Sequence, residues 1–188
     1  MDVNIDVSEI VIKTKRLILR AWRETDLADL YAYASVPGVG EMAGWKYHRS
    51  TEVSQMVLQS FIDDKDVFAI VHQRDSKVIG SLGLHYSWAN EEDEYKSLKA
   101  KEIGYILSKD YWGQGITAEA VRAVIEYCSA NFDIEAFTCR HFSDNIQSRR
   151  VIEKSGFTFV KESDFYSKQL QQTFADLKYI WMRKEQEQ

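Results

Sequence analysis

Two glycines, Gly113 and Gly115, constrain the fold of this chain more than any other feature. They lie between an expected strand over 102–107 and an expected amphipathic helix over 115–131. Glycine permits a tight turn and lets backbone N–H groups come close to a ligand. The start of a helix adds orphan N–H donors and the positive end of the helix dipole. The sequence therefore predicts a strand, a turn and a helix with a pyrophosphate-like anion at the turn.

Other interpretations of this turn are weaker or less specific. A Gly-x-Gly turn before a helix is often only a connection, and the P-loop pattern occurs nowhere in the chain. Gly113-x-Gly115-x-x-Ala118 fits the relaxed dinucleotide fingerprint, with Glu135 about twenty residues further on. However, Glu135 precedes the next expected strand instead of ending it, and hairpin strands come before the turn. A dinucleotide-binding fold is therefore disfavoured.

The remaining periodicity predicts an α+β (mixed α/β) domain with one central sheet and helices on its faces. No repeat or Pro/Ser-rich linker divides the chain, so we expect a single domain over 1–188, with an N-terminal extension at 1–10 and a C-terminal tail at 184–188. The expected strands are 15–22, 67–72, 78–87, 102–107, 136–141, 157–162 and 173–183. The expected helices begin at 25 or 26 and end at 35, begin at 50 or 51 and end near 63 or 64, run from about 115 to 131, and run from 145 to 155.

The charge and the apolar runs exclude several classes of protein. The net charge of −5 disfavours binding to nucleic acid or to anionic membranes, both of which need basic surface. The longest apolar run, 67–71, is far too short to span a bilayer. Residues 1–9 carry acids and no base, unlike a signal peptide, so a cytoplasmic location is expected.

Several spaced motifs together resemble the GNAT acyltransferases, specifically the RimJ/RimL-like branch that acetylates protein N-termini. The opening and late motifs of that branch are matched as well, so the resemblance covers nearly the whole chain. The matching stretches are Glu102-Ile-Gly-Tyr105, Tyr111-Trp112-Gly113-Gln114-Gly115, Asn145-x-x-Ser148-x-x-Val151-x-Glu153-Lys154-x-Gly156-Phe157, Thr14-Lys15-Arg16-Leu17-x-Leu19-Arg20 and Phe174-x-Asp176.

The resemblance implies a mostly antiparallel seven-stranded sheet whose strands 4 and 5 splay apart, with acetyl-CoA inserted between them and no metal. By position, backbone groups of Ile106, Leu107 and Ser108 would pair with pantetheine. The pyrophosphate would be held by the amides of Gly113, Gln114, Gly115, Ile116, Thr117 and Ala118. The branch usually has Ala-Thr where this chain has Thr117-Ala118. The Thr117 side chain would therefore either crowd a phosphate or donate a hydrogen bond to it.

Three residues are candidates for catalysis or for cosubstrate contact. Glu102 matches a glutamate that acts as general base in some GNAT enzymes, although a structural carboxylate paired with backbone or arginine would look the same. The position of the usual acid, a tyrosine, is taken by Ile152, which leaves the Ser148 hydroxyl as the group beside the thiol; a backbone hydrogen bond is the alternative. Asn145 is expected to cap its helix and, by family position, to contact pantetheine.

Histidine and cysteine chemistry is less favoured. His85 is a weaker second candidate for the base, and the four histidines are scattered along the chain. Cys128 and Cys139 lie outside any metal-ligand spacing and are expected to be reduced, buried thiols. A covalent cysteine route is therefore disfavoured, and no metal site is expected.

The acceptor side is less well defined by the sequence. Family geometry places the 38–49 segment, with Trp45 and Tyr47, and an expected loop at 165–174 around the acceptor's path; the aromatic residues would line a peptide channel or simply anchor these segments. The acidic run 91–94 would attract basic tails or be solvated surface. Arg149 and Arg150 would meet a CoA phosphate or lie on an exposed helix face.

These expectations point to an acetyl-CoA-dependent N-acetyltransferase that works by direct attack in a ternary complex, with a protein N-terminal amine as acceptor and a monomeric or homodimeric state. A small amine, such as a polyamine, an amino sugar or an antibiotic, is the alternative acceptor. A CoA-binding module without catalysis is the third hypothesis, motivated by Ile152 and by Thr117-Ala118.

Overall fold

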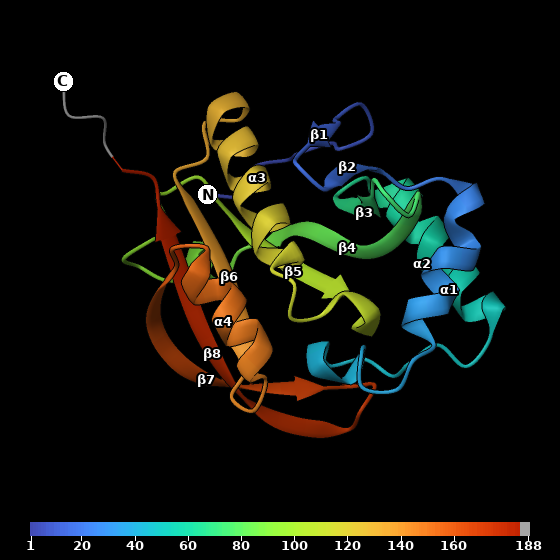
Figure 1. The fold of residues 1–188 in the computed structure, drawn as a ribbon. Helices are drawn as coiled ribbons and strands as arrows, with labels where there is room; N and C mark the ends of the chain where they lie inside the picture. The colour runs from blue at the N-terminus through green and yellow to red at the C-terminus, as the bar shows by residue number, and fades with distance from the viewer. Residues whose placement is uncertain (185–188) are drawn as a thin grey trace.

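The computed structural model describes residues 1–184 and contains one mixed sheet with helices on both faces (Figure 1). The spatial order of its eight strands is β1-β2-β3-β4-β5-β6-β8-β7. The strands are β1 (Ile12–Lys13), β2 (Leu17–Ala21), β3 (Val67–His72), β4 (Lys77–Tyr86), β5 (Ala100–Leu107), β6 (Ala136–Phe142), β7 (Thr158–Ser167) and β8 (Gln172–Met182). The helices are α1 (Leu27–Ala34), α2 (Thr51–Asp64), α3 (Ile116–Asn131) and α4 (Ile146–Lys154).

The mostly antiparallel sheet is confirmed, because β5 and β6 form its only parallel pair in the described chain. The expected count of seven strands is one too low. The additional strand, β1, has two residues and pairs Ile12 with Leu19 of β2 at the edge of the sheet. An edge strand of this length is too short to produce an alternating pattern in the sequence.

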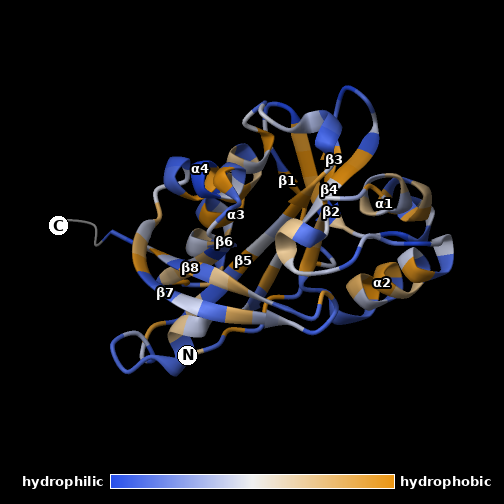
Figure 2. Ribbon diagram, turned by 90° about the horizontal axis from the view of Figure 1, so that it is seen from below, coloured by the Kyte–Doolittle hydropathy of each residue, from blue (hydrophilic) through white to orange (hydrophobic). Residues whose placement is uncertain are grey.

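The two faces of the sheet carry different helices and separate apolar clusters. α1 and α2 cover one face, where Trp22, Leu58 and Ile106 belong to one cluster. α3 and α4 cover the other, where Val124, Ile152 and Leu82 belong to the largest cluster. Strands β3 and β4 lie between both layers and are largely hydrophobic along their length (Figure 2). This central position explains why 67–71 is a continuous apolar run instead of an alternating one.

The β7–β8 hairpin is longer than the expected strands. The segment 165–174, expected to be a loop, is mostly paired strand, with Phe165 opposite Phe174. Phe174 stacks on Phe142 of β6 at 4.2 Å between ring centroids, and this contact holds the end of the hairpin against the sheet. The prediction of a loop was therefore wrong, because the pairing depends on an aromatic contact with a residue more than twenty positions away in the sequence.

The first ten residues pack against the body of the protein. Ile5, Val7 and Ile10 are buried, and the Val7 amide donates to the Lys65 carbonyl at 2.8 Å. The expected C-terminal tail at 184–188 lies, apart from Lys184, outside the described residues. No helix within residues 1–184 has the length and apolar character required to cross a membrane.

Candidate active site

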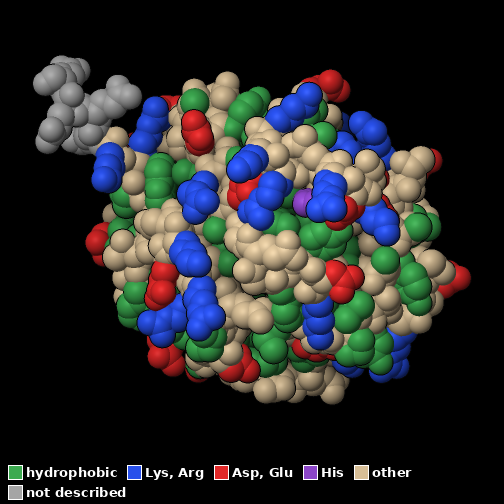
Figure 3. Space-filling view, viewed as in Figure 1, with side chains coloured by type: hydrophobic (Ala, Val, Ile, Leu, Met, Phe, Trp, Pro, Cys, Tyr) green, Lys and Arg blue, Asp and Glu red, His purple; other side chains and the backbone are tan. Residues whose placement is uncertain are grey.

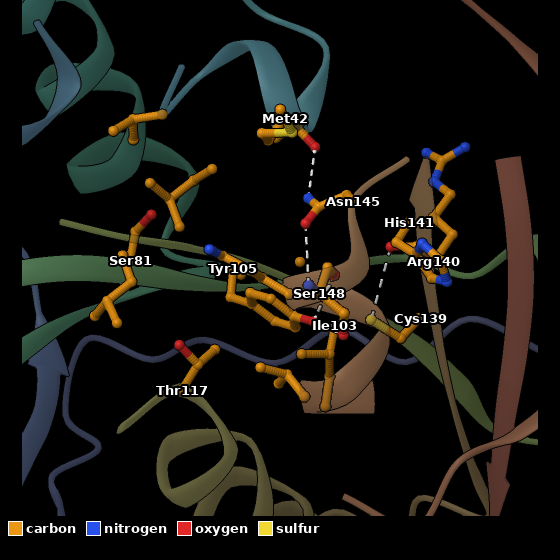
Figure 4. A pocket seen from close by; sticks show the side chains of 18 of the residues that line it. Met42, Ser81, Ile103, Tyr105, Thr117, Cys139, Arg140, His141, Asn145 and Ser148 are labelled. Atoms are coloured by element: carbon orange, nitrogen blue, oxygen red, sulfur yellow. Dashed lines mark hydrogen bonds between the residues drawn. The ribbon is translucent and has the colours of Figure 1, made fainter. Parts of the chain in front are cut away.

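The site begins where β5 and β6 separate. They pair only over Ala100–Glu102 with Ala136–Thr138, and β5 then continues to Leu107 without β6 beside it. A cavity of about 590 Å³ opens next to this splay, within the usual size range of small-molecule sites. Side chains from both strands and from α4 face it in Figure 4. The expected splay of the fourth and fifth strands is thus confirmed for β5 and β6.

The backbone of β5 leaves a free edge at the cavity. The Ser108 amide donates to the Ile79 carbonyl of β4 at 2.8 Å, and a Cβ added to Gly80 would collide with the Ile106 carbonyl oxygen. Because backbone groups alternate along an antiparallel strand, Ile106 and Ser108 direct theirs to β4, whereas Tyr105 and Leu107 direct theirs to the free edge. Of the three residues expected to pair with pantetheine through their backbones, only Leu107 faces the cavity side in this way.

The glycine turn has the conformation that the sequence predicts. Gly113 and Gly115 have φ values of 74° and 73°, in the left-handed region, and α3 begins at Ile116. The first-turn amides of a helix have no carbonyl partner within that helix. Gly113, Gly115, Thr117 and Ala118 line the cavity, whereas Gln114 is not among the lining residues. An anion in this end of the cavity would therefore meet N–H donors and the positive end of the α3 dipole.

Two contacts with the N-terminal part of the chain hold the turn in place. Arg16 donates to the Gln114 carbonyl at 2.9 Å and forms an ion pair with Glu119 of α3 at 2.7 Å. The Gln114 side chain donates to the Asp110 carbonyl at 3.1 Å. Lys and Arg side chains also gather over the side of the molecule that carries α3 and α4 (Figure 3). Arg150 and Lys154 of α4 line the cavity, whereas Arg149 pairs with Glu153 at 2.8 Å.

Glu102 lies in the cavity and is ion-paired. Its Oε1 accepts from Arg140 Nε at 2.9 Å, and its side chain is 9% exposed. Burial raises the pKa of the Glu102 carboxyl, and the Arg140 charge opposes this shift in part. The residue is thus both the structural carboxylate of one hypothesis and a cavity base of the other. A raised pKa makes it a stronger proton acceptor than an ordinary glutamate.

His85 is the cross-strand neighbour of Glu102. The two residues are register partners in the β4–β5 pair, and both line the cavity. His85 Nδ1 lies 3.4 Å from Asp66 Oδ2, and the His85 side chain is about half exposed. Hydrogen bonding from His85 lowers the pKa of the Asp66 carboxyl. His85 is therefore held at the solvent side of the Glu102 position.

Ser148 contacts a residue whose role the sequence did not predict. Its hydroxyl lies 2.8 Å from the Tyr105 hydroxyl. Figure 4 shows the two side chains directed toward each other. Burial raises the pKa of the Tyr105 phenol well above its usual value, so Tyr105 stays protonated and able to donate. The sequence places Tyr105 three residues after Glu102, so the two side chains project from opposite faces of β5; the contact with Ser148 arises only from the packing of α4 on the sheet.

Asn145 caps α4, as the sequence predicts. Its Oδ1 accepts from the Ser148 amide at 3.0 Å, and its Nδ2 donates to the Met42 carbonyl at 3.3 Å. The second bond joins α4 to the 38–49 segment. Asn145 therefore fixes both the first turn of α4 and one wall of the cavity, which all three residues line (Figure 4).

The two segments expected around the acceptor do meet. Ser167 at the end of β7 donates to the Gly44 carbonyl at 2.6 Å, and the Lys46 amide donates to the Gln169 side chain at 3.1 Å. Trp45 lines the cavity, whereas Tyr47 is not among the lining residues. The acidic run is partly neutralised, because Glu92 pairs with Lys161 and Asp93 with Lys96.

The cysteines do not support a covalent route. Cys128 is buried in the core, and burial raises its pKa to about 12. Cys139 lines the cavity, but burial raises its pKa as well, and the Glu102 charge adds to this effect. Both thiols therefore remain protonated and weakly nucleophilic near neutral pH. Within residues 1–184, no three His, Cys, Asp or Glu side chains are grouped so as to hold a metal ion.

A splayed parallel pair, a glycine turn opening a helix and a buried carboxylate beside the splay define an acyltransferase of the acyl-CoA-dependent kind. The chain belongs to the GNAT acetyltransferase family: the acetyltransferase (GNAT) domain model matches residues 16–158. An uncharacterized N-acetyltransferase, YoaA, from Bacillus subtilis is 26% identical over 152 residues, which cover 78% of this chain and 82% of that protein.

Solved structures have the same fold. A GNAT-family acetyltransferase from Bacillus anthracis superposes with a TM-score of 0.79 at 18% identity, covering 92% of this chain and 98% of that one. RimL, a ribosomal L7/L12 α-N-protein acetyltransferase solved in complex with coenzyme A, superposes with a TM-score of 0.72 at 20% identity, covering 92% and 98% of the two chains.

Proposed function

We propose that this protein transfers an acetyl group from acetyl-CoA to a primary amine, the N-terminal α-amine of a protein, by direct attack in a ternary complex. The observation that carries the proposal is the splay of β5 from β6 beside the Gly113–Gly115 turn. It leaves a strand edge and a helix N-terminus facing one cavity, which matches the two parts of CoA: an amide-bearing arm and a pyrophosphate.

The cosubstrate would be held by main-chain groups. The backbone groups of Tyr105 and Leu107 are at the free edge of β5, where an extended amide chain can replace the missing strand. The amides from Gly113 to Ala118 would bind the pyrophosphate, and Asn145 at the head of α4 would approach the arm from the other side. A RimL structure that contains coenzyme A shares the fold, and this supports the assignment.

The catalytic groups divide between the two faces of β5. Glu102 would accept the proton that the amine loses as its nitrogen bonds to the thioester carbonyl carbon. As the C–S bond then breaks, the departing thiolate would take a proton from the Tyr105–Ser148 hydroxyl pair. This pair occupies the role of the tyrosine that Ile152 replaces.

An α-amine is favoured over alkylamines by its acidity. An α-amino group has a reference pKa of about 7.7–8.0, so a glutamate of raised pKa is a sufficient base, whereas an alkylamine such as that of lysine, near 10.4, demands more. The net charge of −5 suits cationic acceptors of either class, basic peptide tails or polyamines. RimL, a ribosomal L7/L12 α-N-protein acetyltransferase, shares the fold at 20% identity, and this supports a protein N-terminus as acceptor.

The test is acetyl-CoA-dependent thiol release with peptides that start in Ser, Ala, Thr or Met, each with basic and acidic tails, and with small polyamines. Mass spectrometry of each product locates the acetyl group. Mass gain at a peptide α-amine supports the proposal, whereas mass gain on small amines alone gives the second acceptor class. Binding of acetyl-CoA without thiol release across the panel would favour the non-catalytic module.

A further inference from the structure

Asp176 of β8 is a buried carboxylate whose hydrogen bonding is incomplete. It is 1% exposed, and within residues 1–184 neither of its side-chain oxygens has a hydrogen bond of standard geometry; the buried Ser163 hydroxyl on β7 is the neighbouring donor that lowers the Asp176 pKa. Its nearest cation is Arg140, whose Nη1 lies 3.8 Å from Asp176 Oδ2. A buried carboxylate normally accepts several hydrogen bonds, because desolvation is otherwise costly.

Asp176 lies in the cavity beside the ion pair of Glu102 and Arg140. Asp176 and Glu102 both line the cavity, and both lie against Arg140, which pairs closely with Glu102 at 2.9 Å. Asp176 is the register partner of Phe142 on β6 and of Ser163 on β7. The Arg140 guanidinium carbon lies over the Phe165 ring, 5.0 Å from the ring centroid. Arg140 therefore contacts both Glu102 and this ring.

Ion pairing at this point is incomplete. Two carboxylates, Glu102 and Asp176, share one guanidinium at ion-pair distance, which leaves an excess negative charge next to the cavity; Lys178 and His141 act on Asp176 only from beyond that distance. The excess is concentrated on Asp176, since Glu102 has the shorter ion pair. A cation that enters the cavity would remove the imbalance and supply N–H donors to the two free oxygens.

We propose that Asp176 binds the ammonium form of the acceptor amine, beside Glu102, and so positions the nitrogen before it loses its proton. This assignment rests on the proposed acetyltransferase activity and adds to it a specificity-determining residue. The ammonium donates to Asp176 and passes its first proton to Glu102, which releases it to solvent before the attack. The neutral nitrogen then attacks the thioester carbonyl carbon and gives its second proton to Glu102. As the C–S bond breaks, the thiolate takes a proton from the Tyr105–Ser148 hydroxyl pair; Glu102 returns its proton to solvent, and solvent reprotonates the pair.

We expect Asp176→Asn to weaken the use of the acceptor amine without lowering the stability of the fold. If Asp176 serves the substrate, removing its charge relieves an unpaired buried carboxylate, and the melting temperature stays equal to that of the wild type or rises. The KM for the acceptor amine rises at least tenfold, while kcat changes less than threefold. Asp164→Asn on β7, an exposed aspartate, is the matched control and leaves both quantities unchanged.

A binding measurement distinguishes failure of this proposal from failure of the proposed function. Calorimetric titration of CoA-loaded protein with alaninamide and with propionamide, which lacks the amino group, involves no turnover. The wild type is expected to bind alaninamide at least tenfold more tightly than propionamide, and Asp176→Asn is expected to lose this preference. Equal binding of the two amides by the wild type, or a lower melting temperature with an unchanged preference in Asp176→Asn, overturns the proposal even where acetyl transfer is observed.

Discussion

Glu102 and Tyr105, three residues apart on β5, lie on opposite faces of the same strand: Glu102 is paired with Arg140 and Tyr105 with Ser148. Strand geometry makes this separation obligatory, because side chains alternate between faces. A thioester lodged in the splay beside β5 would have a carboxylate on one side and two hydroxyl groups on the other. The proton acceptor and the proton donor that we propose are thereby kept apart along one strand.

Replacing Glu102 with Gln is expected to slow acetyl transfer to an α-amine by about 100-fold at pH 6, the low end of what general bases contribute. The loss should shrink toward pH 9, because an amine with a pKa of about 8 is then largely deprotonated on its own. Steady-state thiol release from pH 6 to 9 measures this, with Glu162→Gln on exposed β7 as control. An equal rate for variant and wild type over the whole range would remove Glu102 from the role of base.

Tyr105→Phe and Ser148→Ala should each lower kcat by about tenfold. The two hydroxyl oxygens lie 2.8 Å apart, and the hydrogen-bonded pair acts as a single proton donor in the proposed reaction. Since they act as a unit, the double variant should lose little more than either single variant. Ser155→Ala is the control on the same helix, as its hydroxyl bonds only to the Val151 carbonyl at 2.8 Å. Additive losses in the double variant would show that the two hydroxyls act separately.

Gly115→Ala should weaken CoA binding and destabilise the fold by about 1 kcal/mol or more, since φ is 73° there and an L-residue resists that region. Crowding does not contribute, because the nearest atom to an added Cβ is Arg16 Nη2 at 4.0 Å. Gly115→Asn is the comparison, as asparagine tolerates this conformation better. Urea denaturation and CoA titration give both quantities, and equal stability of the Ala and Asn variants would contradict the backbone argument.

Asn145→Ala should cost about 1 kcal/mol through loss of the α4 cap. Asn145→Ser keeps a capping oxygen but cannot reach the Met42 carbonyl, so it should be near wild type in stability. If the bond to Met42 positions the cavity wall, the Ser variant still shows a raised acceptor KM. A Ser variant as unstable as the Ala variant would show that capping is not the main contribution.

Local features of this fold were predictable, whereas contacts across the sheet were not. The Gly113–Gly115 turn was predictable because its glycines, the apolar strand before it and the helix after it all lie within about 30 residues. The Asn145 cap was predictable for the same reason. Tyr105 belongs to one of the sequence motifs, but its contact with Ser148 forms only through the packing of α4 on the sheet.

The acceptor side illustrates the limit in physical terms. The strand character of 165–174 was missed because its pairing is stabilised by Phe142 on a distant strand. Trp45 and Tyr47, two residues apart, were equivalent in sequence, yet only Trp45 lines the cavity. Asp176 was visible as a letter of a motif, but its importance comes from burial and from the absence of partners. Neither property is encoded in its neighbours along the chain.

The pH dependence of stability tests whether Asp176 is an unpaired charge in the folded protein. Burial raises its pKa above the reference value of 3.8, and the nearby cations only partly offset this shift. The charged groups that face it are Arg140 and His141 on β6, Lys178 on β8 and Glu102 on β5. A carboxyl whose folded pKa is raised stabilises the fold fully below its unfolded pKa and loses that contribution as the pH rises through the folded value.

The free energy of unfolding of the wild type, relative to that of Asp176→Asn, should therefore be highest near pH 4 and should fall steadily toward pH 7, because asparagine does not titrate. Urea denaturation of both proteins at half-unit pH steps measures the difference directly, and Asp164→Asn should show no such trend. The opposite slope, with the wild type gaining on the variant as the pH rises, would mean that the ion pair with Arg140 outweighs burial. Asp176 would then be a structural partner of Arg140 with its charge already satisfied, and no cationic acceptor would be needed to complete the site.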